Sequence, residues 1–306
     1  MALKDLMLES LPFTSTELDR LIETAPLRYK EYEIPKKNSD DKRPIAQPTP
    51  EVKLMQRWLM DEVLRKFKIH HAATAYRKGI QLVDNVRPHA NNRFMLKLDF
   101  RNFFPSIISK DFTSYLVKSG WRNKDDIHLL CNILFKFNRR RKLLELSIGA
   151  PSSPMVSNFL MFDIDQEIYR YCKDNEITYT RYADDLTFST NRTEILRGCK
   201  DFVVDVLDNT DSPLLRLNTD KIVETSVKRG RRVTGLGITS DNKVSIGREK
   251  KRELRLDIYR YINGYLSATE SEALRGYLAF LKSVEPEHIQ RLQKSFDDAR
   301  LGGLLP

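Results

Sequence analysis

The sequence predicts an α+β fold, in which strand-forming and helix-forming segments occur along the same chain. Two runs rich in β-branched and aromatic residues, 177–182 and 186–189, are separated by a short polar stretch, as in two strands joined by a tight turn. Residues 94–100 form a third such run. Other segments, such as residues 51–67, place apolar side chains at helical spacing. With 306 residues, 41% of them hydrophobic, the chain is long enough for a substantial core.

The charge balance of the chain is strongly basic. The 52 Lys and Arg residues exceed the 42 Asp and Glu residues, giving a net charge of +10. This excess favours a polyanionic partner, although a merely basic soluble protein has the same balance. The three cysteines and five histidines show no metal-ligand spacing, which predicts reduced cysteines in a cytoplasmic protein. Because the start of the chain lacks a signal-peptide pattern and no run of 18 apolar residues occurs, no membrane partner is expected.

A basic hairpin is predicted in the N-terminal part of the chain. Residues 29–34 alternate as in a strand, and a turn at 38–41 leads to a second short strand. Lys42 and Arg43 lie next to this turn. These cations either belong to a solvated loop or bind the phosphates of a ligand, for which their charge is suited.

Helices, a cationic run and a loop are predicted in the middle of the chain. Apolar periodicity predicts helices at about 110–119 and 124–137. The next residues, 138–142, include three consecutive arginines, Arg139, Arg140 and Arg141. They form either a solvated face or a contact with a nucleic-acid backbone, and neither is favoured. Gly and Pro at 149–154 predict a loop that opens a helix reaching about Cys172.

The last third of the chain is also predicted to contain both helices and strands, and it carries much of the positive charge. A helix at about 193–209 precedes a strand-like stretch at 215–222 and a basic turn at 228–232. A further strand begins at residue 233, and helices follow it. Residues 227–260 contain eleven Lys and Arg against four acids, so this part either binds RNA phosphates or only stays soluble through its cations.

Three aspartates are the candidate catalytic residues. Asp184 and Asp185 lie between two apolar strands, and Asp99 ends another. Carboxylates in such surroundings are costly unless a cation neutralises them, and oxygen ligands select hard ions such as Mg²⁺. Two ions about 3.5–4 Å apart, held by carboxylates, perform phosphoryl transfer in many enzymes. The alternative for the Asp-Asp pair alone is an ordinary polar hairpin tip.

Several motifs together resemble the reverse transcriptases, and most closely their retron group. The motifs are Lys42 to Pro48, Asn85…His89, the strand ending at Asp99, Gly149-Ala150-Pro151-Ser152-Ser153-Pro154, Tyr182-Ala183-Asp184-Asp185 and Val233-Thr234-Gly235-Leu236. Val86, Ser147 and Ile148 depart from the family pattern. The resemblance implies a right-hand polymerase with fingers, a four-stranded antiparallel palm and a small helical thumb. Fingers and palm would span 1–240, and an RNA-binding thumb 241–306.

The resemblance also implies roles for individual residues. Asp99, Asp184 and Asp185 would be catalytic metal ligands, with Phe100 at the metal site. Lys221 would be the proton donor to pyrophosphate, and the alternative for this residue is an exposed lysine on a strand. The nucleotide would be bound by Lys42, Arg43, Phe104, Ala150 and Pro151, with Phe104 as the barrier to ribonucleotides. The nucleic acid would be bound by Asn85, His89, Arg139, Arg140, Arg141, Val233, Thr234, Gly235, Leu236, Arg248, Lys251, Arg252 and Arg255.

Cofactors and partners follow from the same resemblance. It implies two Mg²⁺ ions, with Mn²⁺ as an alternative, and deoxynucleoside triphosphates as substrates. It implies a structured non-coding RNA that serves as template and, through a guanosine 2′-hydroxyl, as primer. An RNA–DNA hybrid product, an effector protein encoded nearby and a role in antiphage defence are further implications. The alternatives are a stand-alone or CRISPR-associated reverse transcriptase and, in a different class, a catalytically silent RNA-binding scaffold.

Overall fold

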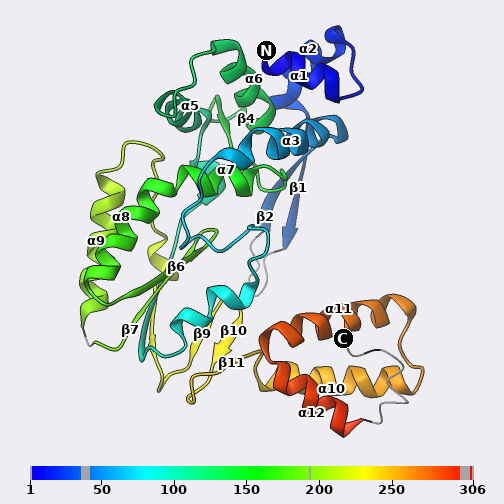
Figure 1. Ribbon diagram of the computed structural model, residues 1–306, viewed down its shortest axis with the longest axis vertical. Helices are drawn as coiled ribbons and strands as arrows, with labels where there is room; N and C mark the ends of the chain where they lie inside the picture. The colour runs from blue at the N-terminus through cyan, green and yellow to red at the C-terminus, as the bar shows by residue number, and fades with distance from the viewer. Residues whose placement is uncertain (1, 36–41, 193, 297–303, 305–306) are drawn as a thin grey trace.

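The chain contains a four-stranded antiparallel sheet, and two helices, α8 (Phe162–Asp174) and α9 (Ile195–Asp208), pack against its strands (Figure 1). The computed structural model describes residues 2–35, 42–192, 194–296 and 304. The strand order is β6-β7-β3-β8, so β3 and β7 are the inner strands. The strands are β3 Phe94–Asp99, β6 Thr178–Tyr182, β7 Asp185–Thr190 and β8 Val223–Ser226. The predicted α+β class is confirmed.

The register of this sheet brings the end of β3 to the turn between β6 and β7. Asp99 pairs with Asp185 across the β3–β7 ladder, and Asp185 also pairs with Tyr182 across β6–β7. Only Ala183 and Asp184 remain to form the turn. Ala183 has φ +57°, in the left-handed region that tight two-residue hairpins use. The predicted hairpin is therefore present, and its backbone bends at the aspartate pair.

The N-terminal part combines helices with a two-stranded hairpin (Figure 1). β1 Tyr29–Pro35 and β2 Lys42–Pro48 pair antiparallel, as predicted. The turn predicted at 38–41 lies outside the described residues. The helices of this part and of the segment after β3 are α1 Leu3–Ser10, α2 Ser15–Thr24, α3 Pro50–Glu62, α4 Phe103–Ser106, α5 Ser109–Lys118 and α6 Lys124–Leu134.

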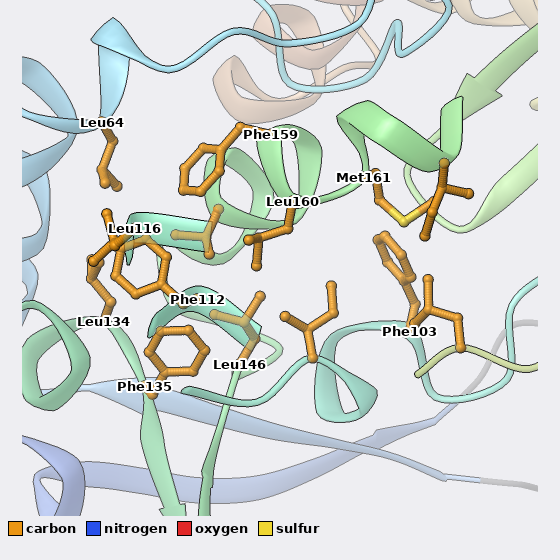
Figure 2. Packing of buried hydrophobic residues seen from close by; sticks show 14 of the residues in the cluster. Leu64, Phe103, Phe112, Leu116, Leu134, Phe135, Leu146, Phe159, Leu160 and Met161 are labelled. Atoms are coloured by element: carbon orange, nitrogen blue, oxygen red, sulfur yellow. The ribbon is translucent and has the colours of Figure 1, made fainter. Parts of the chain in front are cut away.

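Aromatic and aliphatic side chains from these helices form a hydrophobic cluster (Figure 2). The ring of Phe112 lies 5.6 Å from that of Phe135 and 5.9 Å from that of Phe159, measured between centroids. All three side chains are fully buried, and burial of each contributes about 1.5–3 kcal/mol. Since Phe159 belongs to α7 Ser153–Leu160, the cluster fixes the loop before α7 against the helices around it.

The helix predicted at 124–137 is too long, because a hairpin replaces its last turn. Phe135 has an extended backbone (φ −118°, ψ 146°), which ends α6 at Leu134. β4 Lys136–Asn138 and β5 Leu143–Glu145 then pair antiparallel. The cationic run forms the turn of this hairpin. Strands of three residues are too short to leave a period-two pattern in the sequence.

Two further segments differ from their predicted boundaries. The helix expected to reach Cys172 is two helices, α7 and α8 Phe162–Asp174, which meet at Met161. Lys221, expected on a strand, lies in the 3₁₀ turn η5 Thr219–Lys221, directly before β8. α9 Ile195–Asp208 follows the prediction closely and lies beside α8.

Among the described residues, the C-terminal part contains three helices, which lie to one side of the sheet (Figure 1). They are α10 Arg248–Ile262, α11 Ala268–Val284 and α12 Pro286–Ser295. A small sheet of order β11-β10-β9 leads into them, built from β9 Arg231–Val233, β10 Leu236–Ile238 and β11 Val244–Ser245. The strand predicted to begin at residue 233 is instead two strands, with Thr234 and Gly235 at the turn between them.

A second hydrophobic cluster joins these helices to the rest of the chain. Val83, Met95 and Val233 pack in the same buried cluster as Leu254 of α10 and Leu278 of α11. The pairing of β10 with β11 crosses the boundary predicted at residue 240. Among the described residues, no helix combines the length and apolar character needed to cross a membrane.

Candidate active site

The three predicted catalytic aspartates lie together at one end of the sheet. Asp99 and Asp185 are directly paired residues on β3 and β7, and Asp184 occupies the adjoining turn. The amide nitrogen of Phe100 donates a hydrogen bond of 3.1 Å to the carbonyl oxygen of Asp184. The Asn218 amide donates to the carbonyl of Asp99 at 2.7 Å. These backbone bonds fix the strand end and the turn relative to each other.

The local electrostatics disfavour three ionised carboxylates at this place. Burial raises the pKa of Asp184, and the nearby charge of Asp99 raises it further. Burial, followed by repulsion from Asp184 and Asp99, raises the pKa of Asp185 to about 6. A cation beside these groups relieves this repulsion.

Lys221 supplies one such cation. Its Nζ donates to Asp99 Oδ1 at 2.8 Å, while its side chain stays 57% exposed. Burial opposes the lysine charge, but the hydrogen bond to Asp99 and the charges of all three aspartates raise its pKa overall. Lys221 is therefore protonated at neutral pH and contacts Asp99, one of the predicted catalytic carboxylates.

The donor set at this place suits a hard divalent ion. Asp99, Asp184 and Asp185 offer only oxygen ligands, the type that Mg²⁺ prefers. Within the described ranges, no three His, Cys, Asp or Glu side chains already form a metal-ligand cluster. The fit therefore rests on the chemistry of the donors and on their mutual repulsion. Phe100 directs its side chain into the core, where its ring stacks 5.4 Å from that of Phe103.

The loop predicted to contact the nucleotide is bonded to β2. The amide nitrogen of Ala46 donates to the carbonyl of Ile148 at 2.9 Å, and the Ser147 hydroxyl donates to the carbonyl of Ala46. Gly149 has φ +122°, and a Cβ there would lie 2.9 Å from the Ala46 oxygen. The contact explains why glycine is needed at position 149. The motif that this loop resembles has a proline in place of Ser147, and a proline side chain could not make the hydrogen bond to Ala46.

The other predicted nucleotide contacts lie around this loop. Ala150 is buried and Pro151 is partly exposed. Arg43 is exposed at the start of β2. Burial and the charge of Asp99 raise the pKa of Asp184, and the positive charge of Arg43 opposes that rise. Lys42 Nζ lies 3.5 Å from Glu33 on the neighbouring strand. Phe104 is half-buried beside the fully packed Phe103.

Known proteins with similar sequences identify the family to which this chain belongs. Residues 34–240 match the family described as reverse transcriptase (RNA-dependent DNA polymerase). The Retron Ec83 reverse transcriptase of Escherichia coli is 38% identical over 290 residues, covering 93% of this chain and 92% of that protein. The chain belongs to the retron-type reverse transcriptases. The Retron Ec86 reverse transcriptase of Escherichia coli is 32% identical, covering 89% of this chain and 81% of its own length.

The fold of this reverse transcriptase is also found among solved structures. The structure of telomerase from Candida albicans with a fragment of telomeric RNA aligns with a TM-score of 0.51 and 12% identity. The alignment covers 94% of this chain and 59% of the telomerase. The predicted right-hand polymerase fold is thus confirmed, and the protein is an RNA-directed DNA polymerase.

Asn85 and His89 of this reverse transcriptase do not lie where a nucleic acid could touch them. Both side chains are completely buried. His89 Nδ1 lies 2.6 Å from Ser189 Oγ, its Nε2 lies 2.8 Å from Thr180 Oγ1, and burial lowers its pKa to about 3. The expectation of direct contact is therefore wrong for these side chains. The His89 ring holds the segment before β3 against β6 and β7, whereas Asn85 Oδ1 accepts a hydrogen bond of 2.8 Å from Thr74 Oγ1 within that segment.

The other predicted nucleic-acid residues divide into exposed and packed side chains. Val233 and Leu236 are buried, whereas Gly235 is exposed at the turn between β9 and β10 and Thr234 is partly exposed. Lys251 Nζ forms an ion pair with Glu285 Oε2, which joins α10 to the start of α12. The remaining thumb cations are exposed, namely Arg248, Arg252 and Arg255.

The three consecutive arginines of the β4–β5 hairpin also differ in their contacts with the rest of the protein. Arg139 and Arg140 are exposed. Arg141 donates to the carbonyl of Pro105 at 2.7 Å and to Glu145 Oε2 at 2.9 Å. Its guanidinium therefore ties the hairpin to α4, the short helix that contains Phe104 and Pro105.

Sequence reasoning missed a residue that contacts the turn between β6 and β7. Arg181 is fully buried and donates to the carbonyl of Ala183 at 2.9 Å. An arginine within an apolar strand was the available signal, since a buried guanidinium requires an acidic partner. That partner, Asp165, is on α8 and becomes visible only in the folded chain.

Proposed function

We propose that this reverse transcriptase copies part of a structured non-coding RNA into RNA-linked single-stranded DNA by two-metal nucleotidyl transfer. The observation that carries the chemistry is the direct pairing of Asp99 with Asp185 at the sheet end, with Asp184 on the adjoining turn. The similarity to retron enzymes over nearly the whole chain supports the choice of substrate.

The three aspartates would hold two Mg²⁺ ions, which supply a polarised 3′-hydroxyl and charge stabilisation at the leaving oxygen. For this, the Asp99 carboxylate would share or release the ammonium group of Lys221, which lies 2.8 Å away. Lys221 then keeps a proton close to the place where pyrophosphate leaves. This supports its proposed role as general acid.

The nucleotide is placed by residues on two neighbouring segments. Arg43 and Lys42 would bind the triphosphate from β2, and the loop carrying Ala150 and Pro151 would form the wall beneath base and sugar. The hydrogen bonds between Ala46 and residues 147–148 couple these two segments. Phe104, half-buried on the turn after β3, would exclude a 2′-hydroxyl by collision.

The C-terminal helices would bind the cognate RNA. A cavity of about 800 Å³ opens between the β9–β10 turn and α10, and its lining includes Thr234, Gly235, Arg232, Arg248 and Phe280. Exposed arginines bind phosphates, and an aromatic edge suits an unstacked base. Arg252 and Arg255 extend the positive surface along α10.

Analysis of copurifying nucleic acid tests this proposal most directly. We expect a species that is shortened by both ribonuclease and deoxyribonuclease and whose branch is opened by a debranching enzyme. The Asp184→Asn/Asp185→Asn variant serves as the control and should carry the RNA without DNA. RNA without attached DNA in the wild-type preparation, together with activity on any added primed template, would instead support a stand-alone reverse transcriptase.

A cytoplasmic role in antiphage defence, with an effector protein encoded nearby, completes the proposal. Its support is the similarity to retron enzymes alone. Plating phages on cells that carry the full locus, the locus with Asp185→Asn, or the locus without the neighbouring gene would test it. Equal plaque numbers on all three and on empty cells would remove the defence role without affecting the polymerase assignment.

A further inference from the structure

A buried ion pair between Arg181 and Asp165 lies next to the turn that carries the aspartate pair. Arg181 on β6 donates from Nε and Nη2 to the two carboxylate oxygens of Asp165 on α8, at 2.8 and 2.7 Å. Both side chains have no solvent exposure. Tyr179, two residues earlier on the same face of β6, donates its hydroxyl to Asp165 at 2.7 Å. The guanidinium is thus locked in one orientation.

The remaining contacts of Arg181 reach the catalytic turn. Its Nη1 donates to the carbonyl of Ala183 at 2.9 Å and to Asn158 Oδ1 at 3.2 Å. Ala183 has the left-handed backbone of the turn, which costs a non-glycine residue free energy and needs support from its surroundings. Asn158 in turn donates to the carbonyl of Ala75 at 2.9 Å.

The main chain of Arg181 adds a second constraint. Its amide nitrogen donates to the carbonyl of Ala72 at 2.8 Å, and its carbonyl accepts from the amide nitrogen of Thr74 at 2.8 Å. The edge of β6 is thereby covered, so the strand cannot shift relative to the segment before β3. With its main chain and its guanidinium both fixed, Arg181 presents Nη1 to the Ala183 carbonyl in one position.

We propose that Arg181 is a positioning residue of polymerisation: with Asp165 as its anchor, it fixes the Ala183 carbonyl and so sets the direction of Asp184 and Asp185. A lysine at this place carries the same charge but only one donor group, so it cannot hold both Asp165 oxygens and the Ala183 oxygen. The inference deepens the two-metal proposal and rests on it for the metal readout described next.

The test compares Arg181→Lys with a matched control, Arg231→Lys. Arg231 is also buried and donates to main-chain carbonyls, including those of Ala90 and Thr239, but it lies in the small sheet beside the second hydrophobic cluster, away from the aspartates. Primer extension on a homopolymer template gives kcat and KM for the deoxynucleotide. Electron paramagnetic resonance of Mn²⁺ gives metal affinity without requiring turnover.

We expect Arg181→Lys to lower kcat about 10–100-fold and to weaken Mn²⁺ binding by a similar factor, as changes behind metal ligands do. The KM for the nucleotide should change little. Arg231→Lys should leave Mn²⁺ affinity unaltered whatever it does to stability. Equal kcat and Mn²⁺ affinity in Arg181→Lys and the wild type would overturn the proposal. Failure of the wild type to bind Mn²⁺ would instead overturn the two-metal assignment.

A second variant guards against loss of folding. Asp165→Asn/Arg181→Met removes both charges together, which buried ion pairs tolerate better than loss of one partner, and the new asparagine side chain keeps an oxygen for Tyr179. We expect this variant to fold with normal secondary structure and still to show the low kcat and weak Mn²⁺ binding. Full activity in the folded double variant would show that the ion pair only joins α8 to β6.

Discussion

Lys221 and Asp99 form an ion pair at the end of β3, with 2.8 Å between Nζ and Oδ1. The lysine therefore binds one of the two carboxylate oxygens through which Asp99 would bind the proposed metal ion. The proposed metal ion and Lys221 would compete for Asp99, although both would stabilise its negative charge. Replacement of Lys221 should therefore change metal affinity and polymerisation rate in opposite directions.

Lys221→Ala is expected to strengthen metal binding while slowing polymerisation. Removal of the ammonium group frees Asp99, so Mn²⁺ affinity should rise, whereas loss of the proton donor should lower the incorporation rate about 10²-fold. Rapid-quench incorporation of one nucleotide and Mn²⁺ titration measure the two effects. Lys221→Arg, which keeps the charge, serves as control. A variant with weaker metal binding and an unchanged rate would contradict both roles.

Asp185→Asn is expected to abolish polymerisation but to stabilise the metal-free protein at neutral pH. The folded pKa of Asp185 is raised to about 6, above its ordinary value of 3.8. Stability from the protonated carboxyl is therefore fully present below the ordinary pKa and is lost as the pH rises through about 6. The asparagine removes this loss, which amounts to about 1–3 kcal/mol.

Thermal unfolding between pH 4 and pH 8, with and without Mg²⁺, measures this effect. The wild type should lose stability as the pH rises from 4 to 8 and regain it when Mg²⁺ is added. Asp185→Asn should show a smaller loss and a smaller response to Mg²⁺. RNA binding should survive, because the change leaves side-chain volume almost unaltered. A variant less stable than the wild type at pH 8 without metal would count against the repulsion described here.

The catalytic sheet could be predicted from sequence because its information is local. β3 ends at Asp99, β6 ends just before the turn at Ala183 and Asp184, and β7 begins at Asp185. The apolar runs that predict these strands therefore also place the aspartates at their ends. The resemblance of short motifs then supplied the fold. Asn85 and His89 show the limit of such reasoning, since a motif can be important through burial as well as through ligand contact.

What the sequence could not show depends on contacts between distant segments. Lys251 belongs to a cationic run but is paired with Glu285, an acid on a later element that only the fold brings near. Arg141 is paired with Glu145, which is only four residues away, through the β4–β5 hairpin that the sequence did not predict. Charge density along the chain therefore overstates the number of cations free for phosphate. The sequence likewise signals a buried arginine at position 181 but does not identify its partner, because Asp165 is on another element.

Phe104→Ala is expected to admit ribonucleotides selectively. Phe104 is half-buried, so its removal opens space beside the sugar without emptying the core, whereas Phe103 is 5% exposed and stacks on Phe100. Incorporation of each ribonucleotide relative to its deoxy counterpart measures the effect. Phe103→Ala is the contrast: it should lose about 3–5 kcal/mol of stability with unchanged sugar preference. An unchanged preference in folded Phe104→Ala would rule out its role as a barrier.

Gly149→Ala is expected to raise the KM for deoxynucleotides. The added Cβ would lie 2.9 Å from the Ala46 carbonyl, so β2 and the loop before α7 must separate. Gly120→Ala is the matched control, since Gly120 has φ +93° but, among the described residues, no atom within 4 Å of an added Cβ. Both changes carry the left-handed backbone penalty of about 1–2 kcal/mol. Steady-state kinetics should show a higher KM only for Gly149→Ala, and equal KM values in both variants would contradict the coupling.

Substitutions on α10 are expected to separate phosphate contacts from structural cations. Arg252 and Arg255 are exposed, while Lys251 is held by Glu285. Arg252→Ala/Arg255→Ala should weaken binding of RNA and flatten its salt dependence, by about 0.7–0.9 in log–log slope for each phosphate that is no longer bound. Lys251→Ala should lower the stability of the three C-terminal helices while leaving the slope unchanged.

Titration of the copurified RNA and of an unrelated RNA at several salt concentrations distinguishes the outcomes. A larger loss for the copurified RNA would place selectivity on this helix, because shape and 2′-hydroxyl contacts add to the phosphates there. An equal loss for both would restrict α10 to backbone binding, and the cavity at Thr234 and Gly235 would then carry the selectivity. Unchanged affinity and slope in the double variant would show that the exposed arginines of α10 do not bind RNA.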